Sequence, residues 1–174
     1  VIFAGTAGRP LPMARPYKKV LQFEELVTYP MLVIGRAGNP FRSARRLEEL
    51  REAHWIVGAS TSERQASVEE LFQQYRLPKP HIAVRTDSIT QVQSILAASD
   101  LLGLLTVQLF AGIPGNPLVA VPVEEQIKPV RIGLITRKGS VLAPASKALA
   151  DMLRSRARMA AAVAASRRRP AARA

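Results

Sequence analysis

Three loops of the chain combine small residues with hydroxyl side chains, and each follows a short apolar run. They are Gly5-Thr6-Ala7, the stretch from Gly58 to Ser62, and Thr86-Asp87-Ser88. A hydroxyl group both donates and accepts hydrogen bonds, so it suits carboxylates, amides and alcohols. Small neighbours let a ligand approach the backbone closely. The loops therefore predict a site for a small polar or anionic molecule. The candidate ligand-binding residues are Thr6, Ser60, Thr61, Ser62 and Ser88.

Two of these serines also have a structural interpretation. A glutamine follows Ser62, and another follows Ser88, three residues later, which is the capping-box pattern of a helix start. For these two serines capping is the favoured interpretation, whereas for Thr61 ligand contact and a turn weigh equally. Arg64 and Arg85 lie near the same loops. Either could pair with an anionic ligand, and a surface role suits them at least as well.

The residues that most enzymes use are sparse in this sequence. His54 and His81 are the only histidines, both beside expected strands, and there is no cysteine. Neither zinc-ligand spacing, a phosphate-binding glycine loop nor a nucleophile elbow occurs. Asp87 is the only titratable group in the three loops, and the paired glutamates elsewhere are typical of solvated helix faces. We therefore expect no catalytic residue, no metal site, no cofactor and no enzymatic activity.

Apolar patterns predict the elements that position the loops. The expected strands are 1–5, 20–23, 31–34, 55–57, 82–84 and 130–135, and the expected helices lie near 44–50, 62–75, 89–96 and 145–153. Residues 9–16, with three prolines, are expected to form a loop. Alternation of strand and helix predicts an α/β fold with a mainly parallel sheet.

Charge and composition set further bounds. The net charge of the 174 residues is +12, but seven arginines lie at or beyond Arg154, and the rest carries +5. The basic character thus belongs mainly to an Ala/Arg-rich tail, 156–174, which has few large apolar residues and is expected to be disordered. No apolar run is long enough to span a membrane, and no signal-peptide pattern opens the chain. Absence of cysteine suits a reducing cytoplasm.

Several weak motifs, in their order along the chain, carry a family resemblance. They are Phe3-Ala4-Gly5-Thr6, Gly38-Asn39-Pro40-Phe41, Leu50 to Ile56, Gly58 to Tyr75, Val84 to Leu105, Arg131-Ile132-Gly133-Leu134 and Ala143-Pro144-Ala145-Ser146. From about Val1 to Leu153 the sequence resembles the effector-binding domain of LysR-type bacterial transcription regulators. The motif at Gly38 to Phe41 stands where a His-Pro-Leu-type sequence is usual in that family. The sequence departs from the family at Ser99 to Gly103, where Gly-Leu-Gly-Ile is usual.

The resemblance implies a type 2 periplasmic-binding-protein-like fold, with two Rossmann-like α/β lobes joined by crossover strands. Lobe I, which would be incomplete, would comprise 1–29 and 127–155, and lobe II would comprise 30–126. A small-molecule effector would lie between the lobes, touching Thr6 on one side and Ser60, Thr61 and Ser62 on the other. In the full-length cytoplasmic protein, a homo-oligomer (dimer or tetramer), binding would shift the lobes and control operator DNA through a winged helix-turn-helix that this chain lacks.

Two rival functions share this fold. A periplasmic solute-binding receptor has the same lobes and the same kind of cleft, and would differ by an export signal. An enzyme of this fold would need a titratable group in the cleft, for which only Asp87 is available. The Ala/Arg tail favours the regulator.

We predict that the chain alone has no affinity for a specific DNA sequence, because its positive charge is concentrated in the tail and no helix-turn-helix is expected. The tail gives at most weak, salt-sensitive attraction to any DNA. Footprinting at moderate salt, with a variant that lacks residues 156–174 as the control, tests this. A footprint on one defined operator that survives the deletion contradicts the prediction.

Overall fold

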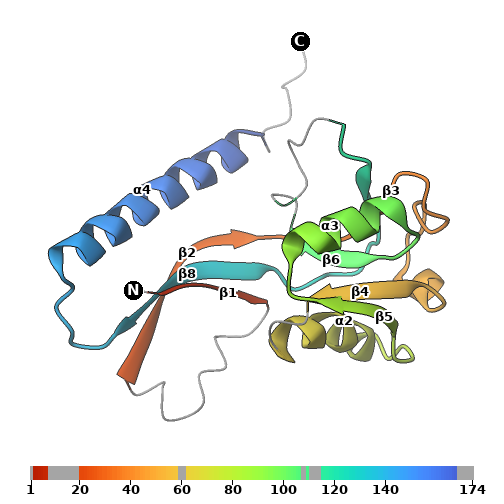
Figure 1. Ribbon diagram of the computed structural model, residues 1–174, viewed down its shortest axis with the longest axis horizontal. Coiled ribbons are helices and arrows are strands. Elements are labelled where there is room, and N and C mark those ends of the chain that lie inside the picture. The colour runs from red at the N-terminus through yellow and green to blue at the C-terminus, as the bar shows by residue number, and fades with distance from the viewer. Residues whose placement is uncertain (1, 8–19, 59–61, 107–108, 110–114, 168–174) are drawn as a thin grey trace. The chain divides into compact units, whose positions relative to one another are not determined.

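The structure of the chain is a computed structural model that describes residues 2–7, 20–58, 62–106, 109 and 115–167 (Figure 1). Side chains of residues 2–7, 62–67 and 160–167 lie outside this description, as does the expected loop 9–16. The chain divides into two compact units. Unit 1 comprises Val1–Tyr29 with Val130–Ala174, and unit 2 comprises Pro30–Pro129.

Unit 2 alternates strands and helices over most of its length. Its elements are β3 (Met31–Arg36), the 3₁₀ helix η1 (Leu47–Leu50), β4 (His54–Gly58), α2 (Ser62–Gln74), β5 (His81–Thr86), α3 (Ile89–Ala98), β6 (Gly103–Thr106) and β7 (Leu118–Val121). The apolar patterns of the sequence predicted all of these except β6 and β7, whose short runs have no distinguishing alternation.

Unit 2 has parallel and antiparallel strand pairs. β4 pairs with β5 in parallel, and a parallel bridge from Trp55 to Leu102 joins β4 to the start of β6. β3 runs antiparallel to both β6 and β7. The strands therefore lie in the order β5-β4-β6-β3-β7.

The expected mainly parallel sheet is wrong for half of these pairings, and the reason is the connections. A helix carries the chain from β4 to β5 and from β5 to β6, and such crossovers return the chain in the same direction. Neither β3 nor β7 is joined to a neighbouring strand in this way, so both pair antiparallel with their neighbours.

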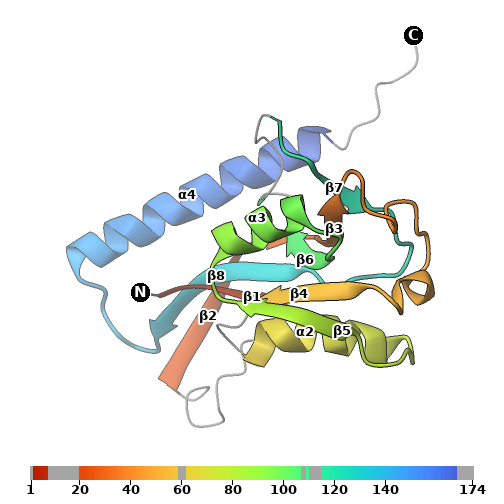
Figure 2. The ribbon, with the colours of Figure 1, turned by 45° about the vertical axis from the view of Figure 1, so that its right-hand side comes forward.

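The core of unit 2 forms on both faces of β4, because its inner residues alternate between two clusters. Trp55 and Val57 are buried with Phe72 and the apolar face of α2, whereas Ile56 is buried with Leu96 of α3. The two helices accordingly cover opposite sides of these strands (Figure 2). The ring of Phe72 meets that of Trp55 edge to face, with centroids 5.6 Å apart.

Unit 1 is an antiparallel sheet with one long helix. β8 (Val130–Arg137) lies between β1 (Ile2–Ala7) and β2 (Leu21–Tyr29), and α4 spans Pro144–Arg167. Among the described residues no helix is long and apolar enough to cross a membrane.

Gly133 of β8 lies opposite a bulge in β2. A Cβ atom at this position would lie 2.1 Å from the Glu24 carbonyl oxygen, so any side chain would displace the backbone.

An ion pair attaches α4 to β2. The Arg154 guanidinium donates to both carboxylate oxygens of Glu24, at 2.8 and 2.7 Å, and to Asp151 at 2.7 Å. These hydrogen bonds lower the pKa of Glu24 and raise that of Arg154. Arg154, counted in the sequence with the basic tail, is therefore a structural residue of unit 1.

Two boundaries differ from those expected. Helix α4 continues to Arg167, whereas disorder was expected from residue 156, because alanine and arginine are strong helix formers and extend a helix that is already nucleated. The change of unit falls at 130 and not 127, because Ile127 packs against the core of unit 2.

Truncation of Phe72 to alanine should destabilise unit 2 by about 3–5 kcal/mol, because the side chain is 1% exposed and loses both apolar burial and the Trp55 contact. Denaturant unfolding measures this, with Gln73→Ala on the exposed face of the same helix as the control. Equal midpoints for the two variants would show that α2 does not pack in this way.

Candidate ligand-binding site

The carboxyl ends of β4 and β5 lie side by side. β4 ends at Gly58 and β5 at Thr86, and these two residues are register partners in a parallel pair. Each strand leads toward a helix, α2 beginning at Ser62 and α3 at Ile89. The first N–H groups of a helix have no partner within it, and the positive end of the helix dipole lies there. This edge of the sheet therefore favours polar and anionic groups.

In the third loop the hydroxyls serve the local fold. Ser88 is the N-cap of α3, and its Oγ accepts a hydrogen bond from the Gln91 amide at 3.4 Å. The Thr86 hydroxyl accepts from the Ser88 amide at 3.2 Å and bonds to the Gln91 side chain. The structural interpretation of Ser88 thus holds, and contact with a ligand stays a prediction.

The other candidates are described only in part. Ser60 and Thr61 lie outside the described residues, and Ser62 is the first residue of α2 with its side chain outside them. Thr6 belongs to unit 1, where its backbone in β1 pairs with Arg131 of β8. Of the two arginines considered, Arg85 is exposed on β5, and Arg64 has no described side chain.

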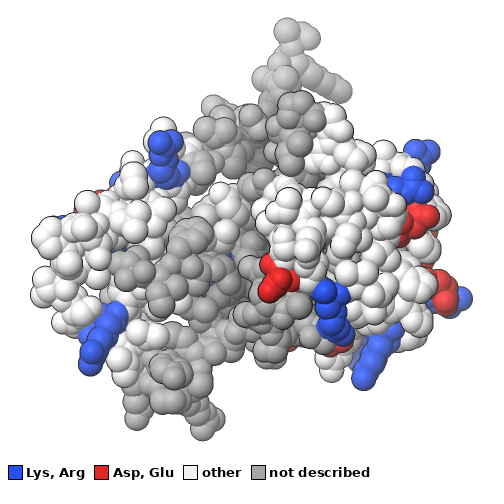
Figure 3. Space-filling view, viewed as in Figure 1, with Lys and Arg blue, Asp and Glu red and all other residues white. Residues whose placement is uncertain are grey.

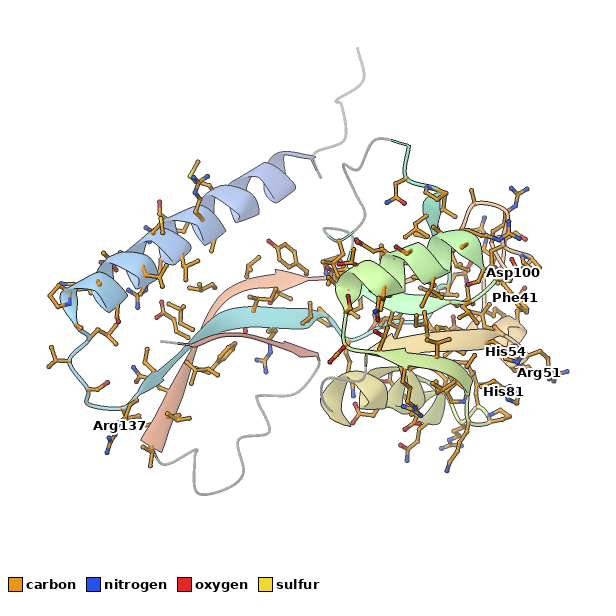
Figure 4. The ribbon with its side chains drawn as sticks, in the orientation of Figure 1. Phe41, Arg51, His54, His81, Asp100 and Arg137 are labelled. Carbon is orange, nitrogen blue, oxygen red and sulfur yellow. The ribbon has the colours of Figure 1, made fainter. Side chains whose placement is uncertain are left out.

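The motif Gly38-Asn39-Pro40-Phe41 proves to be a structural element. Asn39 is 2% exposed, its amide donates to the Asp100 carbonyl at 3.0 Å, and its carbonyl accepts from the Phe41 amide at 2.9 Å. Arg36 bonds the Asp100 carboxylate at 2.9 and 2.8 Å. Side chains of Phe41 and Asp100 lie at the same end of unit 2 (Figure 4). These bonds connect the turn that follows β3 with the segment between α3 and β6.

One pair of side chains that could coordinate a metal ion was not predicted from the sequence. His54 and His81, far apart in sequence, are register partners at the amino ends of β4 and β5, and their rings stack with centroids 5.6 Å apart. Within the described residues, no group of three or more His, Cys, Asp or Glu is placed to hold a metal ion. No local pattern in the sequence indicates this pairing, because the pairing depends on which strands become neighbours.

Charged side chains do not gather on the face drawn in Figure 3. Lys and Arg lie there apart from one another, among uncharged residues and a few acidic ones. On this face, the described residues give no continuous basic surface of the kind that binds nucleic acid.

Comparison with known proteins establishes the class. The family model of the LysR substrate binding domain matches residues 13–158. The chain belongs to this family. It is the effector-binding domain of a LysR-type transcription regulator, which is a regulatory and not an enzymatic module.

Solved structures agree on the fold. The regulatory domain of CcmR from Synechocystis PCC6803, in complex with 2-PG, matches with a TM-score of 0.71 and 16% identity, covering 89% of this chain and 73% of that one. The effector-binding domain of QuiR, in complex with shikimate, matches with 0.70 and 15%, covering 90% and 72%. CbnR, a LysR family transcriptional regulator, matches with 0.66 and 14%, covering 90% and 53%. The expected α/β, periplasmic-binding-protein-like fold is confirmed.

Replacement of Asn39 by alanine should lower the free energy of unfolding by about 1–3 kcal/mol, because it leaves the Phe41 amide and the Asp100 carbonyl without their partner. Asn39→Asp keeps the acceptor for Phe41 but loses the donor to Asp100, so it too should destabilise. Denaturant unfolding of both variants tests this, and Ser43→Ala, at an exposed position nearby, is the control. An Asn39→Ala variant as stable as the control contradicts the structural role.

Proposed function

We propose that this domain senses a small polar or anionic effector at the edge of unit 2 where β4 and β5 end. The supporting observation is the pairing of Gly58 with Thr86, which brings two strand ends, and the helices that follow them, to one place. In open α/β sheets ligands bind at the carboxyl ends of strands. The loop from Gly58 to Ser62 supplies three hydroxyl residues next to the start of α2.

The relatives support a small-molecule effector. The CcmR domain is in complex with 2-PG and the QuiR domain with shikimate. At 16% and 15% identity neither ligand transfers to this chain by similarity. Both are suitable first probes. Thr6 stays a candidate contact from the family resemblance.

Effector binding would act on transcription by a population shift. A ligand moves an equilibrium between two arrangements only by the difference in its affinity for them. We propose that the effector favours one arrangement of the two units, and that in a cytoplasmic homo-oligomer this arrangement changes operator binding by a separate DNA-binding domain.

Replacement of Thr61 by alanine should weaken effector binding by roughly 10- to 150-fold, because one hydrogen bond to a charged group contributes about 1.5–3 kcal/mol. Thr61→Ser keeps the hydroxyl and should weaken binding less. A thermal-shift screen of 2-PG, shikimate and other small carboxylates and phosphates identifies the ligand, and calorimetric titration of the three proteins gives the affinities.

The control is Ser88→Ala, which removes the cap of α3. It should lower the stability by about 1 kcal/mol. Its effect on affinity should be smaller than that of Thr61→Ala. Unchanged affinity in Thr61→Ala assigns that hydroxyl to the turn and moves the site to Thr86, Asp87 and Ser88.

A further inference from the structure

The two histidines of the chain are held together by the β4–β5 ladder. His54 opens β4 and His81 opens β5, and they face each other in the parallel register. Their rings stack at a centroid distance of 5.6 Å with an angle of 30° between the planes. Both side chains are exposed, and both lie at the same end of unit 2, beside Arg51 (Figure 4). Two imidazoles are thus presented to solvent from one place.

The backbone beneath the pair is fixed. The His54 carbonyl accepts a hydrogen bond from the Leu102 amide at 2.9 Å, so β4 is bonded on both edges at this point. Trp55, the next residue, is fully buried, whereas His54, at the first position of the strand, is exposed. Pro80, which precedes His81, is buried as well. The strand pairing therefore holds the backbones of both histidines next to each other.

This geometry suits a metal ion that is coordinated by both imidazoles. Histidine nitrogen binds Zn²⁺ at about 2.0–2.1 Å, so two such nitrogens must come within roughly 4 Å of each other. The nitrogens lie on the rims of the rings. Rotation of the two side chains can therefore bring one nitrogen of each ring closer together than the ring centroids, which are 5.6 Å apart. Nearby charge is balanced, because Arg51 forms an ion pair with Glu52 at 3.5 Å. Imidazole is a ligand for zinc, copper and nickel, and copper binds most strongly in the divalent series.

We propose that His54 and His81 form a two-imidazole site for a divalent first-row transition metal, with Cu²⁺ bound most tightly and water completing the coordination. The site lies at the amino ends of β4 and β5, whereas the proposed effector site lies at their carboxyl ends. It is therefore separate from the proposed function, and the two sites can be tested independently in one protein.

The test is titration of CuCl₂ into the untagged chain near neutral pH, where ligating imidazoles compete well with protons. The variants are His54→Gln, His81→Gln and the double substitution. The second imidazole binds intramolecularly, so removing either one should weaken Cu²⁺ binding by about 100-fold. Electron paramagnetic resonance of the copper complex should show coupling to two imidazole nitrogens in the parent and to one in each single variant.

Arg51→Ala is the matched control, because it changes the charge beside the pair and keeps both imidazoles. It should bind Cu²⁺ at least as tightly as the parent. Because both histidines are exposed, the substitutions should leave the denaturation midpoint unchanged in the absence of metal. Equal affinity in the parent and the double variant overturns the proposal. So does an effect confined to one of the two single variants, or a spectrum of the parent with a single nitrogen.

Discussion

Strand β4 is the constraint on which unit 2 depends. It is hydrogen-bonded on one edge to β5 and on the other to Leu102 at the start of β6, and its faces are covered by α2 and α3. Trp55 is 0% exposed in the middle of one cluster, and Ile56 is 2% exposed in the other. A strand buried on both faces and bonded on both edges fixes the positions of both its ends. What those ends carry is then set by the sequence.

The two ends of β4 carry different chemistry. At the carboxyl end Gly58 leads into the hydroxyl-rich loop and the start of α2, which suits a polar or anionic molecule. At the amino end His54 meets His81, which suits a cation. The core between them is apolar, so each end is solvated separately. The two proposed binding sites therefore lie at opposite ends of one short parallel ladder.

Unit 1 is held together by different means. Its strands are antiparallel, Gly133 admits the bulged backbone of β2, and the bidentate pair of Arg154 with Glu24 attaches α4. Arg131 of β8 forms an ion pair with Glu25 of β2, with 3.5 Å between the charged groups. Charged residues that look like a solvated face in sequence thus connect the helix and the strands. The formal charge of the chain consequently overstates its free basic surface.

The sequence by itself determined the elements with strong periodicity and the family. Helices α2 and α3 were predicted because their apolar residues recur on one face. The capping role of Ser88 was predicted because a cap and its helix are adjacent in sequence. Only the tertiary structure decided what depends on distant neighbours. The antiparallel pairing of β3, the bonds of Asn39 to Asp100 and the meeting of His54 with His81 join residues far apart in the chain. Local sequence patterns do not indicate which strands become neighbours, because strand order depends on burial of the whole sheet between two helices.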